Sequence, residues 1–181
     1  LGGLGVNIPM ATPLVSAFQT IPVTTPLGPV IGVANGDLAV RQQIDGRLRF
    51  TGGAEQLNAN LDVSGKYPAV NPPAASISRV ISSVSSVLPF VSQTPICRIW
   101  GGLLDLTTHA LPVIGCVPSI DGLYVAAGFS GHGFGIAPAV GEIMANKILG
   151  KKHFISLDAF SINRFRDQLE SSQNPIATLH G

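Results

Sequence analysis

Residues 122–150, GLYVAAGFSGHGFGIAPAVGEIMANKILG, contain the pattern that decides the fold of this chain. The five apolar residues from Leu123 to Ala127 predict a short strand that is buried on both faces. A tight turn should follow, because glycine permits φ > 0 and a close approach to the backbone, and four glycines come next: Gly128, Gly131, Gly133 and Gly135. Apolar residues then recur at helical spacing, and Pro138 suits the first turn of that helix.

This succession of strand, glycine loop and helix places free N–H groups and the positive end of a helix dipole at one spot. Such a spot suits an anion or the electron-rich edge of a ring. A tight turn between two core elements would give the same pattern, so the loop alone leaves both interpretations open.

Two further segments favour a ligand-binding loop over a plain turn. Arg98-Ile-Trp-Gly-Gly lies upstream of the loop, and Ser161-Ile-Asn-Arg-Phe lies downstream. Together with AAGFSGHGFGIAPAVGE at residues 126–142, they resemble the C-terminal part of the FAD-dependent amine and amino-acid oxidoreductases. This is the family of D-amino-acid oxidase, glycine oxidase and sarcosine oxidase. The resemblance is dense from Arg98 to Phe165 and thinner from about Val30 to Gly53.

The residues before this region predict mainly strands. Five prolines between positions 9 and 29 leave Val15 to Pro22 as the best extended piece, which fits an edge or interface strand. Asp45-Gly46 between two strand-like runs predicts a hairpin at about residues 37–50. Apolar residues at helical spacing predict a helix at about residues 72–88, with a serine-rich side that faces solvent or another subunit.

The resemblance implies an α/β chain with two portions. Residues 1–95 would be the substrate-domain portion, with an α+β sheet, and residues 96–181 would be the C-terminal strand-loop-helix part of a Rossmann-like FAD-binding domain. We expect the fold to be incomplete without an N-terminal FAD-binding portion. The segment Leu1 to Pro9 has no dinucleotide-binding fingerprint, because no helix can follow its glycines.

Composition excludes several classes of function. The chain has 181 residues, of which 45% are hydrophobic and 12% charged, and its net charge is +1. This charge gives no reason to expect binding to nucleic acid, and the apolar composition suggests that a partner covers part of the surface. We expect no transmembrane span, no signal peptide and no metal site. Cys97 and Cys116 are expected to be buried free thiols of a reducing compartment, which predicts a cytoplasmic protein.

The resemblance also assigns residues to the cofactor. One segment beside the flavin ring would consist of Gly101, Gly102 and Leu103, and the other of Gly131, His132, Gly133 and Phe134. His132 would support the reduced ring electrostatically, which makes it the candidate catalytic residue. Gly102 stands where monomeric sarcosine oxidases have the cysteine that attaches FAD. Non-covalent FAD is therefore expected.

Four residues would face the substrate: Ala39, Arg41, Leu104 and Gly135. Leu104 stands where related oxidases have an arginine that grips the substrate carboxylate, and Gly135 where sarcosine oxidases have a lysine. Ala39 replaces the family's aromatic residue, which predicts a more open pocket wall. Arg41 could bind a carboxylate or form a salt bridge across the domain boundary, and both alternatives stay open.

These assignments predict an oxidoreductase that oxidises a C–N bond of a secondary amine or amino acid by hydride transfer to flavin. The two missing cations favour similarity to the β subunits of multi-subunit enzymes, namely sarcosine, opine or proline-type dehydrogenases and hydrogen cyanide synthase. A companion chain, a cleaved N-terminal portion or residues outside this sequence would supply the rest of the FAD site, most simply in a hetero-oligomer. The alternative is a non-catalytic assembly subunit that keeps the fold without binding FAD.

Overall fold

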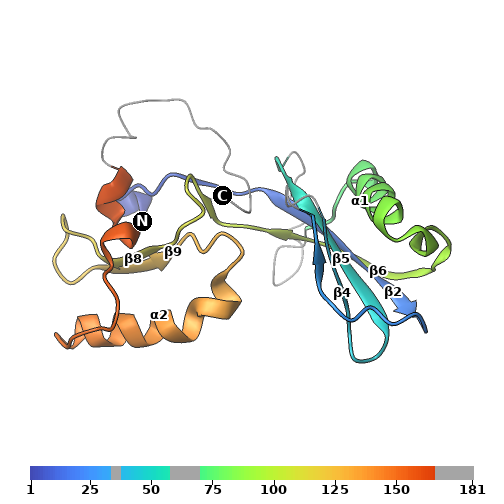
Figure 1. The fold of residues 1–181 in the computed structure, drawn as a ribbon. Helices are drawn as coiled ribbons and strands as arrows, with labels where there is room; N and C mark the ends of the chain where they lie inside the picture. The colour runs from blue at the N-terminus through green and yellow to red at the C-terminus, as the bar shows by residue number, and fades with distance from the viewer. Residues whose placement is uncertain (34–37, 58–69, 166–181) are drawn as a thin grey trace. The chain divides into compact units, whose positions relative to one another are not determined.

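The computed structural model describes residues 1–33, 38–57 and 70–165. They fall into two compact units, whose helices and strands are drawn in Figure 1. The sheet unit consists of residues 12–104. The helix unit consists, within the described residues, of 1–11 and 105–165.

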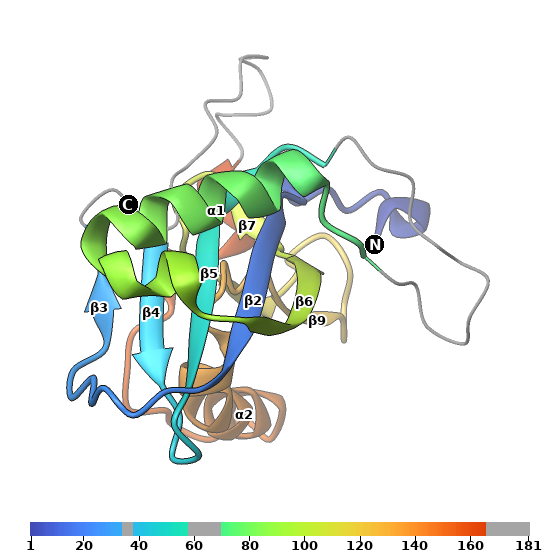
Figure 2. The same ribbon diagram turned by 90° about the vertical axis from the view of Figure 1, so that its right-hand side faces the viewer.

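The sheet unit is an antiparallel sheet with one face covered by a helix (Figure 2). Across the described sheet, the strands follow the order β3 (Ile31–Gly32), β4 (Leu38–Gln42), β5 (Arg47–Glu55), β2 (Leu14–Pro22) and β6 (Ile96–Leu103). The covering elements are α1 (Ala74–Val87) and the short 3₁₀ helix η2 (Pro89–Gln93).

The core of the sheet unit lies between the sheet and α1. The rings of Phe18 and Phe50 stack with their centroids 4.6 Å apart, and Val80 and Val84 of α1 join the same buried cluster. Side chains alternate between the two faces of a strand. The residues next to each core position, such as Arg49 beside Phe50, therefore point to the face opposite α1.

The predicted hairpin is confirmed as β4 and β5. Gly46 has a φ of +83°, and its amide donates to the carbonyl of Gln43 over 2.9 Å. This turn is the reason why Asp45-Gly46 is so strong a local signal, since glycine takes the positive φ without strain. Asp37, which the prediction included, lies outside the described residues.

The predicted helix at about 72–88 is also confirmed, as α1. It begins just after Pro73 and ends before Pro89, where prolines interrupt the helical hydrogen bonds. Its buried side carries Ile77, Val80 and Val84. The serine-rich side is exposed at Ser78, Ser82 and Ser86.

The strand predicted at Val15 to Pro22 is present as β2, but of the two expected positions, edge or interface, the edge position is wrong. β2 pairs with β5 on one side and with β6 on the other. Prolines stand only beside its start and at its end, so its interior can donate to both neighbours. Because β6 pairs along β2, residues 96–104 belong to the sheet unit. The resemblance in sequence had grouped them with residues 96–181, the expected part of the FAD-binding domain. The functional division at residue 95 stays a prediction.

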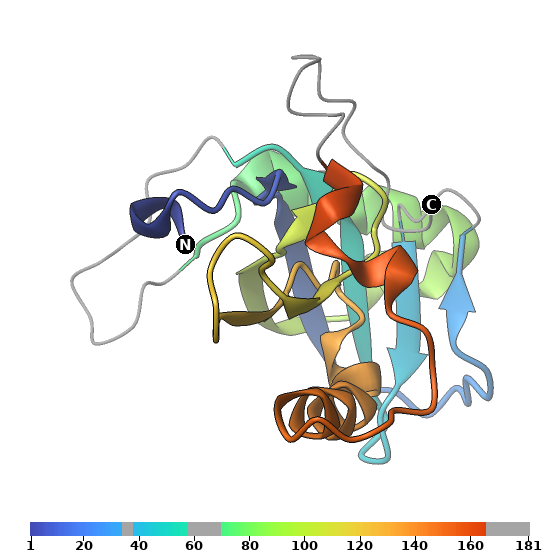
Figure 3. The ribbon, with the colours of Figure 1, turned by 90° about the vertical axis from the view of Figure 1, so that its left-hand side faces the viewer.

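The helix unit contains two short strand pairs and one long helix (Figure 3, α2 in orange). Its elements are η1 (Gly2–Leu4), β1 (Met10–Ala11), β7 (Leu106–Thr107), β8 (Val113–Cys116), β9 (Tyr124–Ala127), α2 (Gly133–Ile148), η3 (Asp158–Phe160) and η4 (Ile162–Phe165). β1 pairs with β7, and β8 pairs with β9, both in antiparallel register. Val140 and Ile143 of α2 pack against Ile114 of β8 and Leu157. No helix in the described part of the chain could cross a membrane.

The structure contradicts three expectations from the sequence. β9 is not buried on both faces, because Val125 is buried but its neighbour Ala126 is exposed. α2 begins at Gly133, so Pro138 lies inside the helix instead of in its first turn. Cys97 and Cys116 are free thiols but both are exposed, since each stands at an outward position of its strand.

Candidate functional site

The loop between β9 and α2 is a sharp bend that is pressed against β7. Gly128, Ser130 and Gly131 all have positive φ angles, of 69°, 51° and 84°. A Cβ atom on Gly128 would lie 2.4 Å from Cγ2 of Thr107, so only glycine fits at this position. The turn predicted by the glycine spacing is therefore present. Its positive φ angles fall on Gly128, Ser130 and Gly131.

Asp105 and Ser130 hold this bend in place. The Asp105 carboxylate accepts hydrogen bonds from the amides of Gly128, at 2.8 Å, and Phe129, at 3.1 Å. The buried Ser130 hydroxyl donates to the Gly128 carbonyl over 3.1 Å and accepts from the amide of Thr107 over 3.2 Å. Sequence reasoning missed both residues, because their partners lie more than 20 positions away and no local spacing marks them.

These contacts narrow the set of amides available to a ligand. The amides of Gly128, Phe129 and Ser130 are bound within the protein, and that of His132 donates to the Phe129 carbonyl over 2.9 Å. Within the described residues, the amides of Gly131, Gly133 and Phe134 donate to no protein acceptor. These three surround the start of α2, where the first N–H groups of a helix lack partners. His132 is exposed and makes no side-chain cap.

The glycines predicted to face the flavin differ in the space around them. Adding a Cβ atom to Gly102 or Gly135 would meet no other atom within 4 Å, so a planar ring could approach the backbone there. A Cβ on Gly101 would lie 2.9 Å from Cδ1 of Leu14. Gly101 is thus a packing position. At Gly102 and at the start of α2, the backbone therefore leaves room for the flavin ring of FAD.

The structure brings the candidate residues together in two groups. Gly101, Gly102, Leu103 and Leu104 follow one another at the end of β6, where the amide of Leu104 donates to the Pro13 carbonyl over 3.0 Å. Gly131 to Gly135 form the second group at the start of α2. The first group belongs to the sheet unit and the second to the helix unit.

Ala39 and Arg41 line a pocket on the face of the sheet opposite α1. The pocket has a volume of about 290 Å³ and is also lined by Val30, Val40, Arg49 and Thr51. Arg41 lies directly opposite Arg49 in the β4–β5 register. Sequence reasoning did not single out Arg49. The predicted hairpin could have indicated Arg49, because pairing the strands around Asp45 places positions 41 and 49 side by side.

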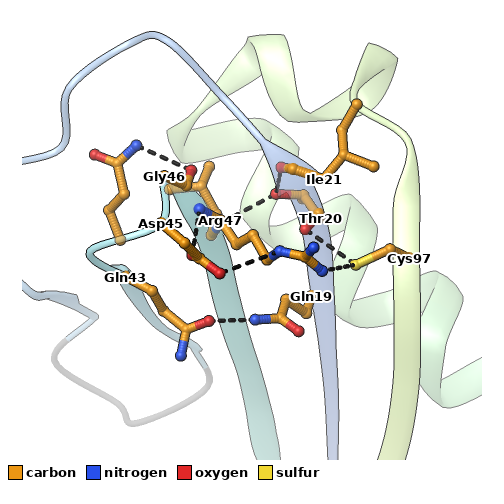
Figure 4. A network of polar contacts seen from close by, with 10 residues as sticks. Gln19, Thr20, Ile21, Gln43, Asp45, Gly46, Arg47 and Cys97 are labelled. Carbon is orange, nitrogen blue, oxygen red and sulfur yellow. Dashed lines mark hydrogen bonds and ion pairs between the residues drawn. The ribbon is translucent and has the colours of Figure 1, made fainter.

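Another arginine of this face, Arg47, is paired with a carboxylate (Figure 4). Nε of Arg47 lies 3.2 Å from Oδ2 of Asp45, and Nη1 of Arg47 donates to Sγ of Cys97 over 3.3 Å. The Cys97 thiol in turn donates to the Thr20 carbonyl over 3.1 Å. In the same network, the side chain of Gln19 donates to that of Gln43.

On the helix-covered face, Glu55 forms an ion pair with Arg79, at 2.9 Å. Burial raises the pKa of the Glu55 carboxyl, but hydrogen bonds from Ser76, Arg79 and Ser16 and the charge of Arg79 outweigh it. The pKa of Glu55 therefore lies below its ordinary value.

In the helix unit, Arg164 ties η4 to the segment that follows β7. Its guanidinium donates to the carbonyls of Leu111, at 2.6 Å, and Pro112, at 2.9 Å. Burial lowers the pKa of Arg164. The guanidinium also lies over the ring of Phe165, with 4.4 Å between Cζ and the ring centroid.

Comparison with known proteins supports the resemblance. The family model described as FAD dependent oxidoreductase matches residues 5–147. Sarcosine oxidase subunit beta of Rhizobium meliloti is 26% identical over 161 residues, which cover 89% of this chain and 36% of that protein. Glycine oxidase of Bacillus licheniformis is 38% identical over 79 residues, covering 44% of this chain and 21% of that protein.

Solved structures agree. The L-proline dehydrogenase of P. horikoshii superimposes with a TM-score of 0.78 at 27% identity, covering 92% of this chain and 43% of that one. Glycine oxidase of Geobacillus kaustophilus gives a TM-score of 0.74 at 20% identity, covering 89% of this chain and 41% of that one. The chain thus spans less than half the length of these relatives.

Proposed function

Because the chain belongs to the family of FAD dependent oxidoreductases, we propose that it forms the flavin-ring and substrate-side portion of an amine or amino-acid oxidising enzyme. The bond oxidised is a C–N bond of a secondary amine or amino acid. The relatives named sarcosine oxidase subunit beta and L-proline dehydrogenase motivate this choice of substrate.

The observation that carries the proposal is the set of three amide donors at Gly131, Gly133 and Phe134. They lie at the start of α2, where the helix dipole adds positive potential. When bound, FAD supplies the hydride acceptor of the reaction. The amides and His132 would stabilise negative charge at this position, and Asp105 and Ser130 would keep the amides in place without reorganisation.

On the sheet unit, Gly102 and Leu103 would form the second segment beside the cofactor, and Ala39 and Arg41 would face the substrate. No general base on this chain is required for hydride transfer. The task of these residues is to orient the amine and to exclude water. Gly102 offers no side chain for a covalent link, which supports a non-covalent cofactor.

The remaining FAD-binding polypeptide is part of the proposal. This chain covers 36% of its relative, the sarcosine oxidase subunit beta of Rhizobium meliloti, whose name also implies a multi-subunit enzyme. We therefore expect the chain to function with additional polypeptide that holds the nucleotide end of FAD, in a hetero-oligomer.

A visible spectrum tests the proposal. The protein, purified with every polypeptide that accompanies this chain, should be yellow and should bleach when its amine substrate is added without oxygen. Heat denaturation should release the flavin into the supernatant, because the cofactor is non-covalent. A colourless preparation that takes up no FAD would instead favour a non-catalytic assembly subunit.

A further inference from the structure

Among the described residues of the sheet unit, positive charges outnumber negative charges. The unit's described residues include five arginines and two carboxylates. Both carboxylates are taken, since Asp45 pairs with Arg47 and Glu55 pairs with Arg79. Among the described residues of the sheet unit, the three arginines left without an ion pair are Arg41, Arg49 and Arg98.

These three arginines lie in one row across the face opposite α1. Arg41 of β4 is opposite Arg49 of β5, Arg49 is opposite Gln19 of β2, and Gln19 is opposite Arg98 of β6. Partners in register point to the same face of a sheet. Neighbouring strands are about 4.8 Å apart, so the row extends over roughly 15 Å from Arg41 to Arg98.

Trp100 orders two of the three guanidinium groups. Cζ of Arg49 lies 5.5 Å from the centroid of the Trp100 ring, and Cζ of Arg98 lies 5.4 Å from it. The ring therefore positions both cations by cation–π contact. Nε of Arg49 is buried and finds no acceptor among the described residues. A buried donor without a partner is costly, and a bound acceptor would remove that cost.

Space for a ligand lies beside the row. The pocket of about 290 Å³ has Arg41 and Arg49 in its lining, and the other lining residues, Val30, Ala39, Val40 and Thr51, are small or apolar. Its volume lies at the lower end of the usual range for small-molecule sites. An amino-acid-sized molecule is the matching class.

We infer that this face binds an amine substrate that carries two carboxylates, as an N-carboxyalkyl amino acid does. Arg41 and Arg49 hold the first carboxylate between them, and Arg98 reaches the second. Guanidinium groups are planar donors that match carboxylates and stay charged at every working pH. A single carboxylate would leave Arg98 without a partner. The inference rests on the proposed function, because it names the substrate class of the same enzyme.

Two measurements on the complete flavoprotein, with all its polypeptides, test the inference. The first is calorimetric binding of glutarate and of butyrate, which differ in one carboxylate and need no flavin chemistry. The second is anaerobic flavin reduction by iminodiacetate and by sarcosine. Glutarate should bind at least about tenfold more tightly than butyrate, and kcat/KM should favour iminodiacetate by a similar factor.

Variants test whether the row of three arginines causes the preference for glutarate. Arg49→Gln and, separately, Arg98→Gln should reduce the preference for glutarate to less than about threefold. Arg49→Lys keeps the charge and should retain part of the preference, which also shows that the substituted protein folds. Arg79→Gln is the matched control, because it removes an arginine of α1, the helix that covers the other face of the sheet, and it should leave the preference unchanged.

The outcomes separate the two proposals. Equal binding of glutarate and butyrate, with flavin bleached equally by both amines, would overturn the inference and leave the proposed function standing. Selective binding of glutarate that depends on Arg49, in a protein whose flavin no amine reduces, would support the anion site and overturn the proposed function. An equal loss of preference in Arg79→Gln would overturn the assignment to the arginine row.

Discussion

The carboxylate of Asp105 accepts a hydrogen bond of 2.8 Å from the amide of Gly128, and this contact anchors the loop that precedes α2. Asp105→Ala removes that bond and the one from Phe129. We expect the free energy of unfolding to fall by about 1–2 kcal/mol and the affinity for FAD to fall by roughly tenfold, because the loop loses its anchor. Chemical denaturation and FAD titration measure the two effects.

Asp121→Ala provides the control for that variant. Asp121 is an exposed turn residue, and its removal should change the free energy of unfolding by less than about 0.5 kcal/mol. If both variants lowered FAD affinity equally, the anchoring role of Asp105 would be wrong.

Gly52 and Val80 define the closest packing between the sheet and α1. A Cβ atom on Gly52 would lie 2.3 Å from Cγ2 of Val80. Gly52→Ala should therefore destabilise the protein by about 1–3 kcal/mol through overpacking. The double variant Gly52→Ala with Val80→Ala should recover part of this loss, because the second change removes the clashing methyl group.

Gly141→Ala is the matched control for Gly52, since a Cβ there meets no other atom within 4 Å and the residue lies inside α2. It should be neutral or stabilising by up to about 1 kcal/mol. A Gly52→Ala variant as stable as Gly141→Ala would refute the close packing.

Local chemistry made part of the fold predictable. Asp45-Gly46 forms a turn between two strand-like runs, so the β4–β5 hairpin follows from neighbouring residues alone. Prolines at both ends bound α1 in the same local way. The place of β2 in the sheet was not predictable, because β2 pairs with residues 96–103 at the far end of the unit. The sequence of β2 does not indicate which strands will pair with it.

The candidate site was also predictable only where it depends on neighbouring residues. The glycine spacing predicted the bend before α2, but not that the Asp105 carboxylate accepts from the first amides of the bend or that the Ser130 hydroxyl accepts from the amide of Thr107. The helix start was misplaced because Pro138 was taken as its first turn, while the glycines at 133 and 135 already have helical geometry. Glycine has a weak helix propensity, so its presence in the first turn leaves no clear signal in the sequence.

The ion pair between Glu55 and Arg79 predicts a pH dependence of stability. The pKa of Glu55 is lowered in the folded protein, so its carboxylate stabilises the fold at pH values above the unfolded pKa of about 4.5. This contribution is lost as the pH falls below that value through the folded pKa. Because Arg79 is exposed, we expect less than about 1 kcal/mol. Denaturation of the wild type and of Glu55→Gln between pH 7 and about pH 3 measures it.

The difference in stability between these two proteins should be constant above about pH 5 and should shrink in acid. In Arg79→Gln the pKa of Glu55 should rise, and the acid-dependent difference should become smaller. A difference that grew on acidification would contradict the assigned direction of the pKa shift.

His132→Ala tests the contribution of the loop to chemistry. His132 is exposed between the free amides of Gly131 and Gly133, and its side chain makes no cap to α2. Its removal should therefore leave assembly and unfolding unchanged. Flavin reduction by substrate should slow by about tenfold to a hundredfold, because one donor or positive charge near the reduced ring is lost. Stopped-flow absorbance measures this rate, and an unchanged rate would remove His132 from the mechanism.

Arg41 and Arg49 make a prediction that needs neither cofactor nor substrate. Like charges directly opposite in a sheet repel, and the structure places no carboxylate of the described residues between these two. Arg41→Gln should therefore stabilise the ligand-free protein by about 0.2–1 kcal/mol at low ionic strength, and the gain should shrink at high salt because of screening. Arg79→Gln, which breaks an ion pair, should have the opposite sign. Thermal denaturation at two salt concentrations distinguishes these outcomes, and a destabilised Arg41→Gln variant would show that the charge of Arg41 is already neutralised within the protein.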